Sequence, residues 1–268
     1  MVGIRQAFIL AGGHGTRLGA TKEKPKPMYC VPEEGAPLIG QIMDSAFEAG
    51  IDNIIFSVND IREMLTRCVI GCAEKLGTFD ARITFAQESL EGSILAATNY
   101  LQSDFFLLCS DIYSDIDFRR LAEHHLESGK IVTVAAKVAA NFQRASDAGM
   151  IDMAERPAGM GKGPRYISKK AQASQEPPLL YRPKLLKNPD RACLVPQYAY
   201  DMGCWAMKKE FLQALRQAKK DGKTFEDALI AQFEQGKAAV YIHDGYWFDI
   251  GTPEKYKAAC EFAKQHQK

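Results

Sequence analysis

The sequence predicts an α/β fold in which a doubly wound, mostly parallel, Rossmann-like sheet is flanked by helices. Strand-like and helix-like segments alternate through the first half, which is typical of a parallel sheet covered on both faces. The chain has 268 residues, enough for one large domain. Apolar residues make up 46% and charged residues 25%, a balance that can bury a core and argues against disorder.

In the first half, apolar residues recur at helical spacing in some segments and run continuously in others. Gly50 and Gly77 stand where helices should end. We expect strands at 7–10, 54–58, 82–86, 105–109 and 131–138, and helices at 39–47, 61–76, 94–101 and 118–126.

The second half begins with a stretch, 158–196, whose glycines, prolines and lysines predict a loop-rich insertion. Beyond it, Thr252 is a suitable N-cap for a last helix that has Pro253 in its first turn. We expect strands at 200–207 and 238–242 and helices at 210–218 and 225–233.

Charge and cysteine usage limit the partners and the compartment. A formal net charge of +1 gives no long-range attraction to nucleic acid or to an anionic membrane, so neither is expected as a partner. Seven cysteines without paired spacing suggest reduced, buried thiols and a cytoplasmic protein. Arg5 and Gln6 interrupt the first apolar stretch, so we expect no signal peptide there.

A glycine-rich turn directly follows the first strand. Glycines let backbone N–H groups approach phosphate oxygens, and Arg17 adds a forked cation for a polyphosphate. The turn matches neither a Walker loop nor a dinucleotide fingerprint. A turn of this kind can also merely link a strand to a helix. The expected nucleotide-binding residues are Leu10, Ala11, Gly12, Gly13, Gly15 and Thr16.

A basic segment follows, in which Pro25 and Pro27 rigidify the backbone around Lys26. A lysine held in this way is suited to neutralising phosphate charge. Read alone, such a run is usually a solvated basic loop. The glycine-rich turn and the lysine motif together favour the functional interpretation.

These two motifs resemble the sugar-phosphate nucleotidyltransferases, whose pattern is Gly-Gly-x-Gly-Thr-Arg-Leu followed by Pro-Lys-Pro-Met or Leu. The resemblance also covers the helix start at 37–39 and reaches nearly to the C-terminus. It implies a single nucleotidyltransferase domain over 1–268, with a nucleotide-binding half at 1–140. A smaller sugar-phosphate-binding half would occupy 141–268 and include the 158–196 insertion.

The resemblance also implies roles for individual residues. Arg17 and Lys26 would act as catalytic electrostatic groups at the reacting phosphates. Gln87 would contact the base, and Gly92 would let the base lie close to the backbone. These two residues also fit an ordinary polar loop and helix start.

Two aspartates are the metal ligands that the resemblance implies. Asp111 follows a buried strand at the carboxyl edge of the sheet, and Asp249 lies among large apolar residues just before the last helix. Together they would hold Mg²⁺ and leave positions for phosphate oxygens. Ser110 departs from the glycine usual in the family. Asp111 or Asp115 could instead cap the next helix, and Asp249 could pair in the core.

The sugar-phosphate site is less defined. Gly149 and Gly203 resemble the two family glycines that let a sugar ring approach the backbone, although either fits an ordinary strand glycine. The family's sugar-phosphate lysine has two imperfect counterparts, at 155–157 and at 182–184, and we favour Lys184.

The resemblance therefore implies transfer of a nucleotidyl group from a nucleoside triphosphate to a sugar 1-phosphate, giving a nucleotide sugar and pyrophosphate. We favour guanylyl transfer to a mannose- or heptose-type sugar. Uridylyl or thymidylyl transfer to a glucose-type sugar and a non-catalytic nucleotide-sugar sensor stay open, as does a homo-oligomer.

Three other features give weaker hypotheses. The Asp-x-Asp spacing at 115–117 would suit a glycosyltransferase, but it lies beyond the buried strand. Cys68 and Cys72 lack a second ligand pair for zinc. His124 and His125 are expected on a helix surface.

Overall fold

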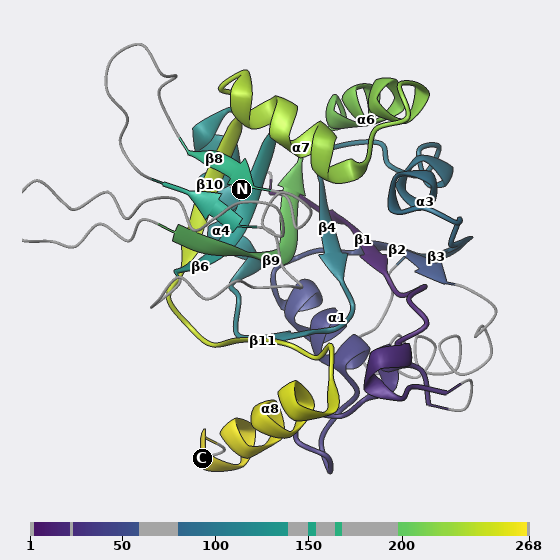
Figure 1. The fold of residues 1–268 in the computed structure, drawn as a ribbon, viewed down its shortest axis with the longest axis vertical. Coiled ribbons are helices and arrows are strands. Elements are labelled where there is room, and N and C mark those ends of the chain that lie inside the picture. The colour runs from purple at the N-terminus through teal and green to yellow at the C-terminus, as the bar shows by residue number, and fades with distance from the viewer. Residues whose placement is uncertain are drawn as a thin grey trace, which may run out of the picture.

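The computed structural model describes residues 3–21, 24–58, 80–138, 150–153, 164–167 and 198–266. Within these ranges it confirms a mostly parallel central sheet with helices on both faces (Figure 1). The strands of this sheet are β1 (Gln6–Leu10), β2 (Asn53–Val58), β3 (Asp80–Phe85), β4 (Phe105–Cys109), β6 (Val132–Val138), β7 (Met150–Asp152), β8 (Arg165–Ile167), β9 (Tyr198–Met207) and β10 (Ala238–His243).

The strand order is β10-β6-β9-β4-β1-β2-β3, with β7 and β8 attached beside β9. β1 runs parallel to both β2 and β4, while β9 runs antiparallel to β4 and β6. The chain leaves β1 towards β2 and β3 and then returns to β4 on the other side. This reversal makes the carboxyl ends of β1 and β4 a topological switch point, where open α/β sheets bind ligands.

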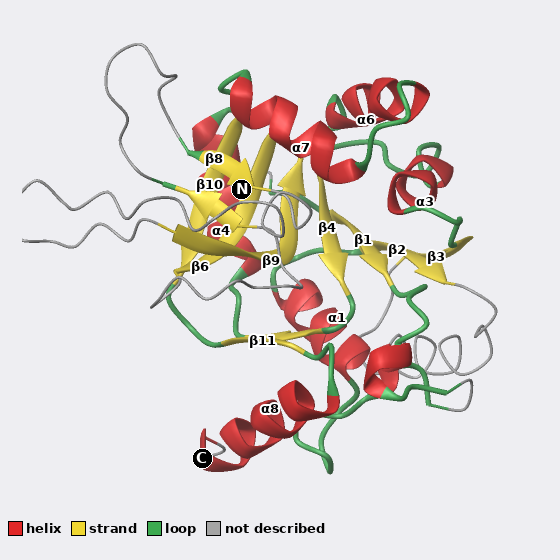
Figure 2. Ribbon diagram, in the orientation of Figure 1, coloured by secondary structure: helices red, strands yellow, loops and turns green. Residues whose placement is uncertain are grey.

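The helices are α1 (Leu38–Glu48), α3 (Leu90–Ala96), α4 (Phe118–Ser128), α6 (Phe211–Lys220), α7 (Phe225–Glu234) and α8 (Pro253–His266). Side chains of α3, α6 and α7 share one core with Phe8, and those of α1 and α4 share the other with Ile9. Figure 2 shows α3, α6 and α7 on one side of β1 and α1 on the other. Successive β1 residues thus face opposite cores, which explains the continuous apolar run from Ala7 to Leu10.

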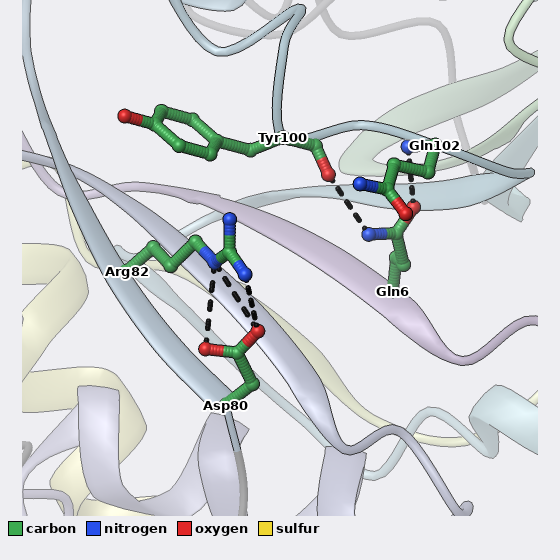
Figure 3. A network of polar contacts seen from close by, with 5 residues as sticks. All are labelled: Gln6, Asp80, Arg82, Tyr100 and Gln102. Carbon is green, nitrogen blue, oxygen red and sulfur yellow. Dashed lines mark hydrogen bonds and ion pairs between the residues drawn. The ribbon is translucent and has the colours of Figure 1, made fainter.

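Gln6, at the start of β1, is buried, and the nitrogen and the oxygen of its side-chain amide both form hydrogen bonds (Figure 3). Its amide nitrogen donates to the Tyr100 carbonyl at 3.0 Å, and its amide oxygen accepts from the Gln102 backbone N–H at 2.9 Å. These bonds satisfy the buried amide and tie β1 to the turn before β4. Nearby, Arg82 pairs with Asp80 and lies over the Tyr100 ring.

A second, two-stranded sheet was not expected from the sequence. It pairs β5 (Ile112–Ser114) with β11 (Trp247–Asp249) in antiparallel register. Both strands are only three residues long, so neither gives a periodic signal in the sequence. This small sheet joins the segment after β4 to the segment before α8 (Figure 1).

One other sequence prediction needs correction. The helix expected at 94–101 is α3, which begins at Leu90 because the Ser89 side chain accepts the Gly92 N–H as an N-cap. Within the 158–196 stretch, which was predicted to be a loop-rich insertion, the described residues include β8, which pairs with β7. The helix expected at 61–76, with Cys68 and Cys72, lies outside the described residues.

His125 is buried in the core, not on the surface of α4 as expected. Its Nδ1 lies 2.8 Å from the Thr133 hydroxyl. Burial, reinforced by Lys208 and His124, lowers its pKa from 6.5 to about 4, so the ring is neutral at pH 7. Because His125 directly follows another histidine, the sequence pattern did not reveal that it is buried.

The described cysteines partly fit the expectation of buried thiols. Cys204 and Cys260 are buried, whereas Cys30 and Cys109 are partly exposed. Across the described ranges, no helix combines the length and the apolar character needed to span a bilayer.

Candidate active site

The candidate active site forms where β1 and β4 end side by side. Leu10 and Cys109, the last residues of these strands, are register partners. The Ser110 backbone N–H and hydroxyl both donate to the Leu10 carbonyl, at 3.2 and 2.7 Å. The serine that replaces the usual glycine is thus accommodated by a bond to the neighbouring strand.

A cavity of about 410 Å³ opens at this switch point. It brings together the glycine-rich turn, the lysine motif, the segment before α3 and the end of β4. Its lining includes the following predicted site residues: Leu10, Gly12, Gly13, Gly15, Thr16, Arg17, Lys26, Gln87 and Asp111.

The glycine-rich turn packs directly against the lysine motif. Gly15 has a φ of 61°, and a Cβ there would lie 2.7 Å from the Ala20 Cβ and 3.1 Å from the Lys26 Cβ. A side chain at this position would therefore force the two motifs apart. The next three residues form a 3-10 turn, Thr16–Leu18, that carries Arg17 to the cavity wall.

Lys26 begins a second 3-10 turn, Lys26–Met28, after an extended Pro25. Its Nζ forms an ion pair with the Asp111 carboxylate, and its side chain is only 12% exposed. The pairing links two motifs that are 85 residues apart in sequence. A cation and an anion thus pair in the lining of the cavity.

The two predicted metal ligands are brought close by the small sheet. Asp249 is the register partner of Ile112, and the Ile250 N–H donates to the Asp111 carbonyl at 2.9 Å. The Asp249 carboxylate also pairs with Lys255 Nζ at 2.9 Å. Asp111 does not cap the next helix, because Asp117 is the N-cap of α4.

Two predicted nucleotide residues do not line this cavity. The Ala11 side chain is buried in the core shared with α1. A Cβ at Gly92 would lie 3.0 Å from both the Gln87 Cβ and the Lys219 Nζ. A glycine at position 92 therefore fits the close packing between α3 and its neighbours, whatever it binds.

A second cavity, of about 190 Å³, shares Arg17, Leu90, Cys109 and Asp111 with the first. Asp249 and Gly203 also line it, together with Ile112, Tyr166, Asp201, Met202, Trp205, Phe225, Glu226 and Trp247. Of the residues expected to bind the sugar phosphate, only Gly203 can be placed, because Gly149 and Lys184 lie outside the described residues.

Asp201 lines this second cavity and was not among the residues predicted from the sequence. Its carboxylate accepts from the Tyr166 hydroxyl at 2.8 Å, from the Trp205 indole N–H at 3.1 Å and from the Gly203 N–H at 2.9 Å. The signal available was an acidic residue inside a strand of otherwise largely apolar residues. Lys255, the partner of Asp249, was also missed, and its place in a helix gave no signal.

The two aspartates of the Asp-x-Asp spacing make contacts away from the candidate active site. Asp115 lies 2.9 Å from the His243 ring, and Asp117 caps α4. Both line a different cavity, bounded by α1 and β5. Neither residue lines the cavity beside the glycine-rich turn or the cavity that holds Asp201.

Comparison with known proteins gives one family. The sequence model described as nucleotidyl transferase matches residues 6–266. A mannose-1-phosphate guanyltransferase of Yarrowia lipolytica is 27% identical over 263 residues, covering 94% of this chain and 62% of the relative. The chain therefore spans about three fifths of that relative's length.

Solved structures share the fold. A UTP-bound UGPase from Acinetobacter baumannii has a TM-score of 0.71 at 19% identity, covering 99% of this chain and 95% of that one. HddC from Yersinia pseudotuberculosis, complexed with GMP-PN, has a TM-score of 0.62 at 20% identity, covering 97% and 99%.

Proposed function

The chain belongs to the nucleotidyl transferase family, and on that premise we propose that it transfers a nucleotidyl group from a nucleoside triphosphate to a sugar 1-phosphate. The products would be a nucleotide sugar and pyrophosphate. The observation that supports this most strongly is that Arg17, Lys26 and Asp111 line one cavity, which adjoins a second lined by Asp249.

In the proposed reaction, a phosphate oxygen of the sugar 1-phosphate attacks the α-phosphorus of the triphosphate in line. The bond from the α-phosphorus to the bridging oxygen breaks, and pyrophosphate departs with its electron pair. Arg17 lines both cavities and would neutralise the departing pyrophosphate. Lys26 would balance charge at the reacting phosphates, and neither residue needs to move a proton.

The chemistry of Asp111 and Asp249 suits a divalent cation. In the described part of the chain, no group of three or more His, Cys, Asp or Glu side chains could enclose a metal. Mg²⁺ usually takes only one or two carboxylates and completes its shell with phosphates and water, so this pair fits it. When bound, Mg²⁺ would supply Lewis-acid stabilisation of phosphate charge. In the structure, the Asp111 carboxylate pairs with Lys26 and the Asp249 carboxylate pairs with Lys255.

We assign the two halves of the chain separate tasks. Of the two adjoining cavities, residues 1–140 supply nearly all of the larger one, of about 410 Å³, and would bind the nucleotide there. Residues 141–268 contribute Tyr166, Asp201 and Trp247 to the smaller cavity and would bind the sugar phosphate. Asp249 crosses this division, because the small sheet returns it to Asp111.

For the base and sugar, we favour guanylyl transfer to a mannose- or heptose-type sugar 1-phosphate, in the cytoplasm. The support is the named activity of the Yarrowia lipolytica relative and the guanine nucleotide analogue in the HddC complex. The UTP-bound neighbour, which scores higher in structural similarity, supports uridylyl transfer as the second candidate.

The test is pyrophosphate release in the presence of Mg²⁺. Each of the four ribonucleoside triphosphates and dTTP is crossed with the 1-phosphates of mannose, manno-heptose, glucose and N-acetylglucosamine. We expect release to require one preferred pair, with GTP and a mannose- or heptose-type sugar as that pair. If the folded chain bound a nucleotide sugar but released no pyrophosphate with any pair, the sensor alternative would replace this proposal.

A further inference from the structure

The distance between the two proposed metal ligands depends on the register of the small sheet formed by β5 and β11, which lies outside the main sheet (Figure 1). Asp249 is the last residue of β11 and pairs with Ile112, the residue directly after Asp111. A two-stranded sheet with three residues in each strand is marginally stable by itself. A slip of one residue would turn the Asp249 side chain to the opposite face, out of the cavity that both aspartates line. Contacts beyond the small sheet must therefore help to fix its register.

Asp115 and His243 make such a contact, at the end of the small sheet that is farther from Asp249. Asp115 directly follows β5, and His243 is the last residue of β10 in the main sheet. The His243 Nε2 lies 2.9 Å from the Asp115 carboxylate and 3.2 Å from the Tyr246 carbonyl. Both partners are acceptors, so Nε2 carries a proton and donates to them. The bond thus joins the segment after β5 to the main sheet.

The connecting segment between β10 and β11, residues 244–246, is also attached to the main sheet. Lys137 belongs to β6, the strand that pairs with β10. Its Nζ donates to two successive carbonyls of the connecting segment, those of Asp244, at 2.8 Å, and of Gly245. The backbone that leads into β11 is therefore held from one side by Lys137.

On the other side, the connecting segment encloses the Asp115 carboxylate. The His243 side chain is 5% exposed and that of Asp115 is 46% exposed, so the bond between them lies at the edge of the core. A Cβ at Gly245 would collide with the carboxylate and come within 2.6 Å of its Cγ. Only a glycine lets the backbone pass this close. The carboxylate therefore fits directly against the backbone that leads to Asp249.

We propose that Asp115 and His243 are positioning residues, which fix the register of the small sheet and so keep Asp249 within reach of the cation bound by Asp111. This inference rests on the proposed function, since it concerns the metal site of that reaction. Neither Asp115 nor His243 lines either of the two adjoining cavities. They act through the backbone of β5 and β11 and do not touch the cation or the substrates.

The test disrupts the bond in two independent ways. Asp115→Ala removes the acceptor. Gly245→Ala keeps both partners but pushes the carboxylate away, and the atoms that must move belong to the end of a side chain. Each variant should weaken Mn²⁺ binding in the presence of nucleotide by about tenfold, measured by water proton relaxation, because ligands that are poorly oriented bind metal weakly.

The dependence of turnover on Mg²⁺ distinguishes positioning from a general loss of stability. At limiting Mg²⁺, Asp115→Ala and Gly245→Ala should each lose turnover by about tenfold, since a misplaced group far from the chemistry can cost this much or more. High Mg²⁺ should restore most of this loss. Asp115→Asn keeps an oxygen acceptor for His243, so it should recover most of the Mn²⁺ affinity that Asp115→Ala loses.

Asp117→Ala is the matched control, because Asp117 lies two residues further along and caps α4. Loss of this cap should cost about 1 kcal/mol of stability and leave Mn²⁺ affinity unchanged. Thermal unfolding of every variant is measured in parallel. If Asp115→Ala does not fold, Gly245→Ala decides. Unchanged Mn²⁺ affinity in the folded Asp115 and Gly245 variants, or an equal loss in Asp117→Ala, would overturn the proposal.

Hydrogen exchange followed by NMR tests the small sheet without metal or substrate. The Ile250 N–H donates to the Asp111 carbonyl. It should exchange about tenfold faster in Asp115→Ala than in the wild-type chain, and at the wild-type rate in Asp117→Ala. Faster exchange together with wild-type Mn²⁺ affinity would overturn the positioning role.

Mn²⁺ binding and hydrogen exchange also separate this inference from the proposed function. A chain that shows both expected changes but releases no pyrophosphate with any substrate pair would retain the inference and lose the activity. A chain that releases pyrophosphate with the same Mg²⁺ dependence in Asp115→Ala and the wild type would retain the activity and lose the inference. A wild-type chain that bound no Mn²⁺ with nucleotide would overturn both the metal assignment and this inference.

Discussion

At the scale of single residues, the ion pair between Lys26 and Asp111 is the contact on which the proposed chemistry depends most. The lysine is nearly buried, and the two prolines on either side hold its backbone. Few side-chain conformations are therefore open to it, and its charge stays in the lining of the 410 Å³ cavity. This preorganisation is what makes an electrostatic group effective in catalysis.

Lys26→Ala should lower kcat/KM by about 100- to 1000-fold, the range seen when one preorganised charge-stabilising group is removed. The free energy of unfolding should fall by no more than about 2 kcal/mol. Steady-state kinetics and denaturant unfolding on the same preparation measure both values. Lys24→Ala is the control, because Lys24 is exposed and lies over the Tyr29 ring. A Lys26 variant that kept its turnover would refute the assignment.

His125 should make stability depend on pH. Its pKa is about 4 in the folded chain and 6.5 when unfolded, so the unfolded state binds more protons between these values. The stability that depends on the neutral ring is present above pH 6.5 and is lost as the pH falls towards 4, at a cost of roughly 3 kcal/mol. Urea unfolding at several pH values should show that the free energy of unfolding depends less steeply on pH in His125→Asn than in the wild-type chain. An identical pH dependence in the two chains would contradict this account.

At the scale of the elements, the sequence predicted the long segments well and the short ones poorly. β1, β4 and α7 follow the expected ranges, because each has an uninterrupted apolar run or a full helical period. β5 and β11 have three residues each and are specified by pairing with one another, which a local pattern cannot reveal. The same contrast between local patterns and distant contacts applies to the residues that line the two adjoining cavities.

The residues named by local motifs, from Leu10 to Lys26, lie together as expected, except that Ala11 points into the core. The bulge in β9, where the pairing with β6 shifts register between Trp205 and Asp201, and the carboxylate of Asp201 depend on contacts with β8 and with Trp205, which are distant from the recognisable motifs. Reasoning from motifs alone therefore predicted many residues that line the larger of these two cavities and missed most of those that line the smaller one.

The bulge itself can be tested through Gly203. A Cβ at this position would lie 3.2 Å from both Cβ and Sγ of Cys109, and its φ of 73° disfavours any L side chain. Gly203→Ala should cost about 1–3 kcal/mol of stability from backbone strain, and more from the contact with Cys109. Gly222→Ala has a similar φ of 69° with open space around it, so it should show the backbone cost alone. Equal losses in denaturant unfolding would argue against a tightly packed bulge.

At the scale of the whole molecule, the topology brings distant segments to one place. The switch point places the glycine-rich turn beside Asp111, and the small sheet returns Asp249 from the far end of the chain. The larger cavity and the smaller cavity meet at Arg17 and Asp111. A triphosphate in one and a sugar phosphate in the other would have their reacting atoms at this junction.

This arrangement predicts a shared dependence on Mg²⁺. Asp111→Asn and Asp249→Asn should each raise the Mg²⁺ concentration needed for half-maximal turnover by about tenfold or more, since each removes a charged ligand. Both should also weaken binding of Mn²⁺ in the presence of nucleotide, measured by water proton relaxation. Asp244→Asn, which is exposed and lines neither of these two cavities, should change neither value. Full Mg²⁺-dependent turnover in both variants would refute the metal assignment.

The most direct measurement of the central claim follows the phosphate oxygens. The chain is incubated with Mg²⁺, GTP and mannose 1-phosphate whose non-bridging phosphate oxygens carry ¹⁸O. The masses of the nucleotide sugar and of pyrophosphate are then measured by mass spectrometry. Attack by the sugar phosphate on the α-phosphorus predicts that every labelled oxygen appears in the nucleotide sugar and none in pyrophosphate. Label in pyrophosphate, or no nucleotide sugar with any triphosphate and sugar 1-phosphate pair, would contradict the account.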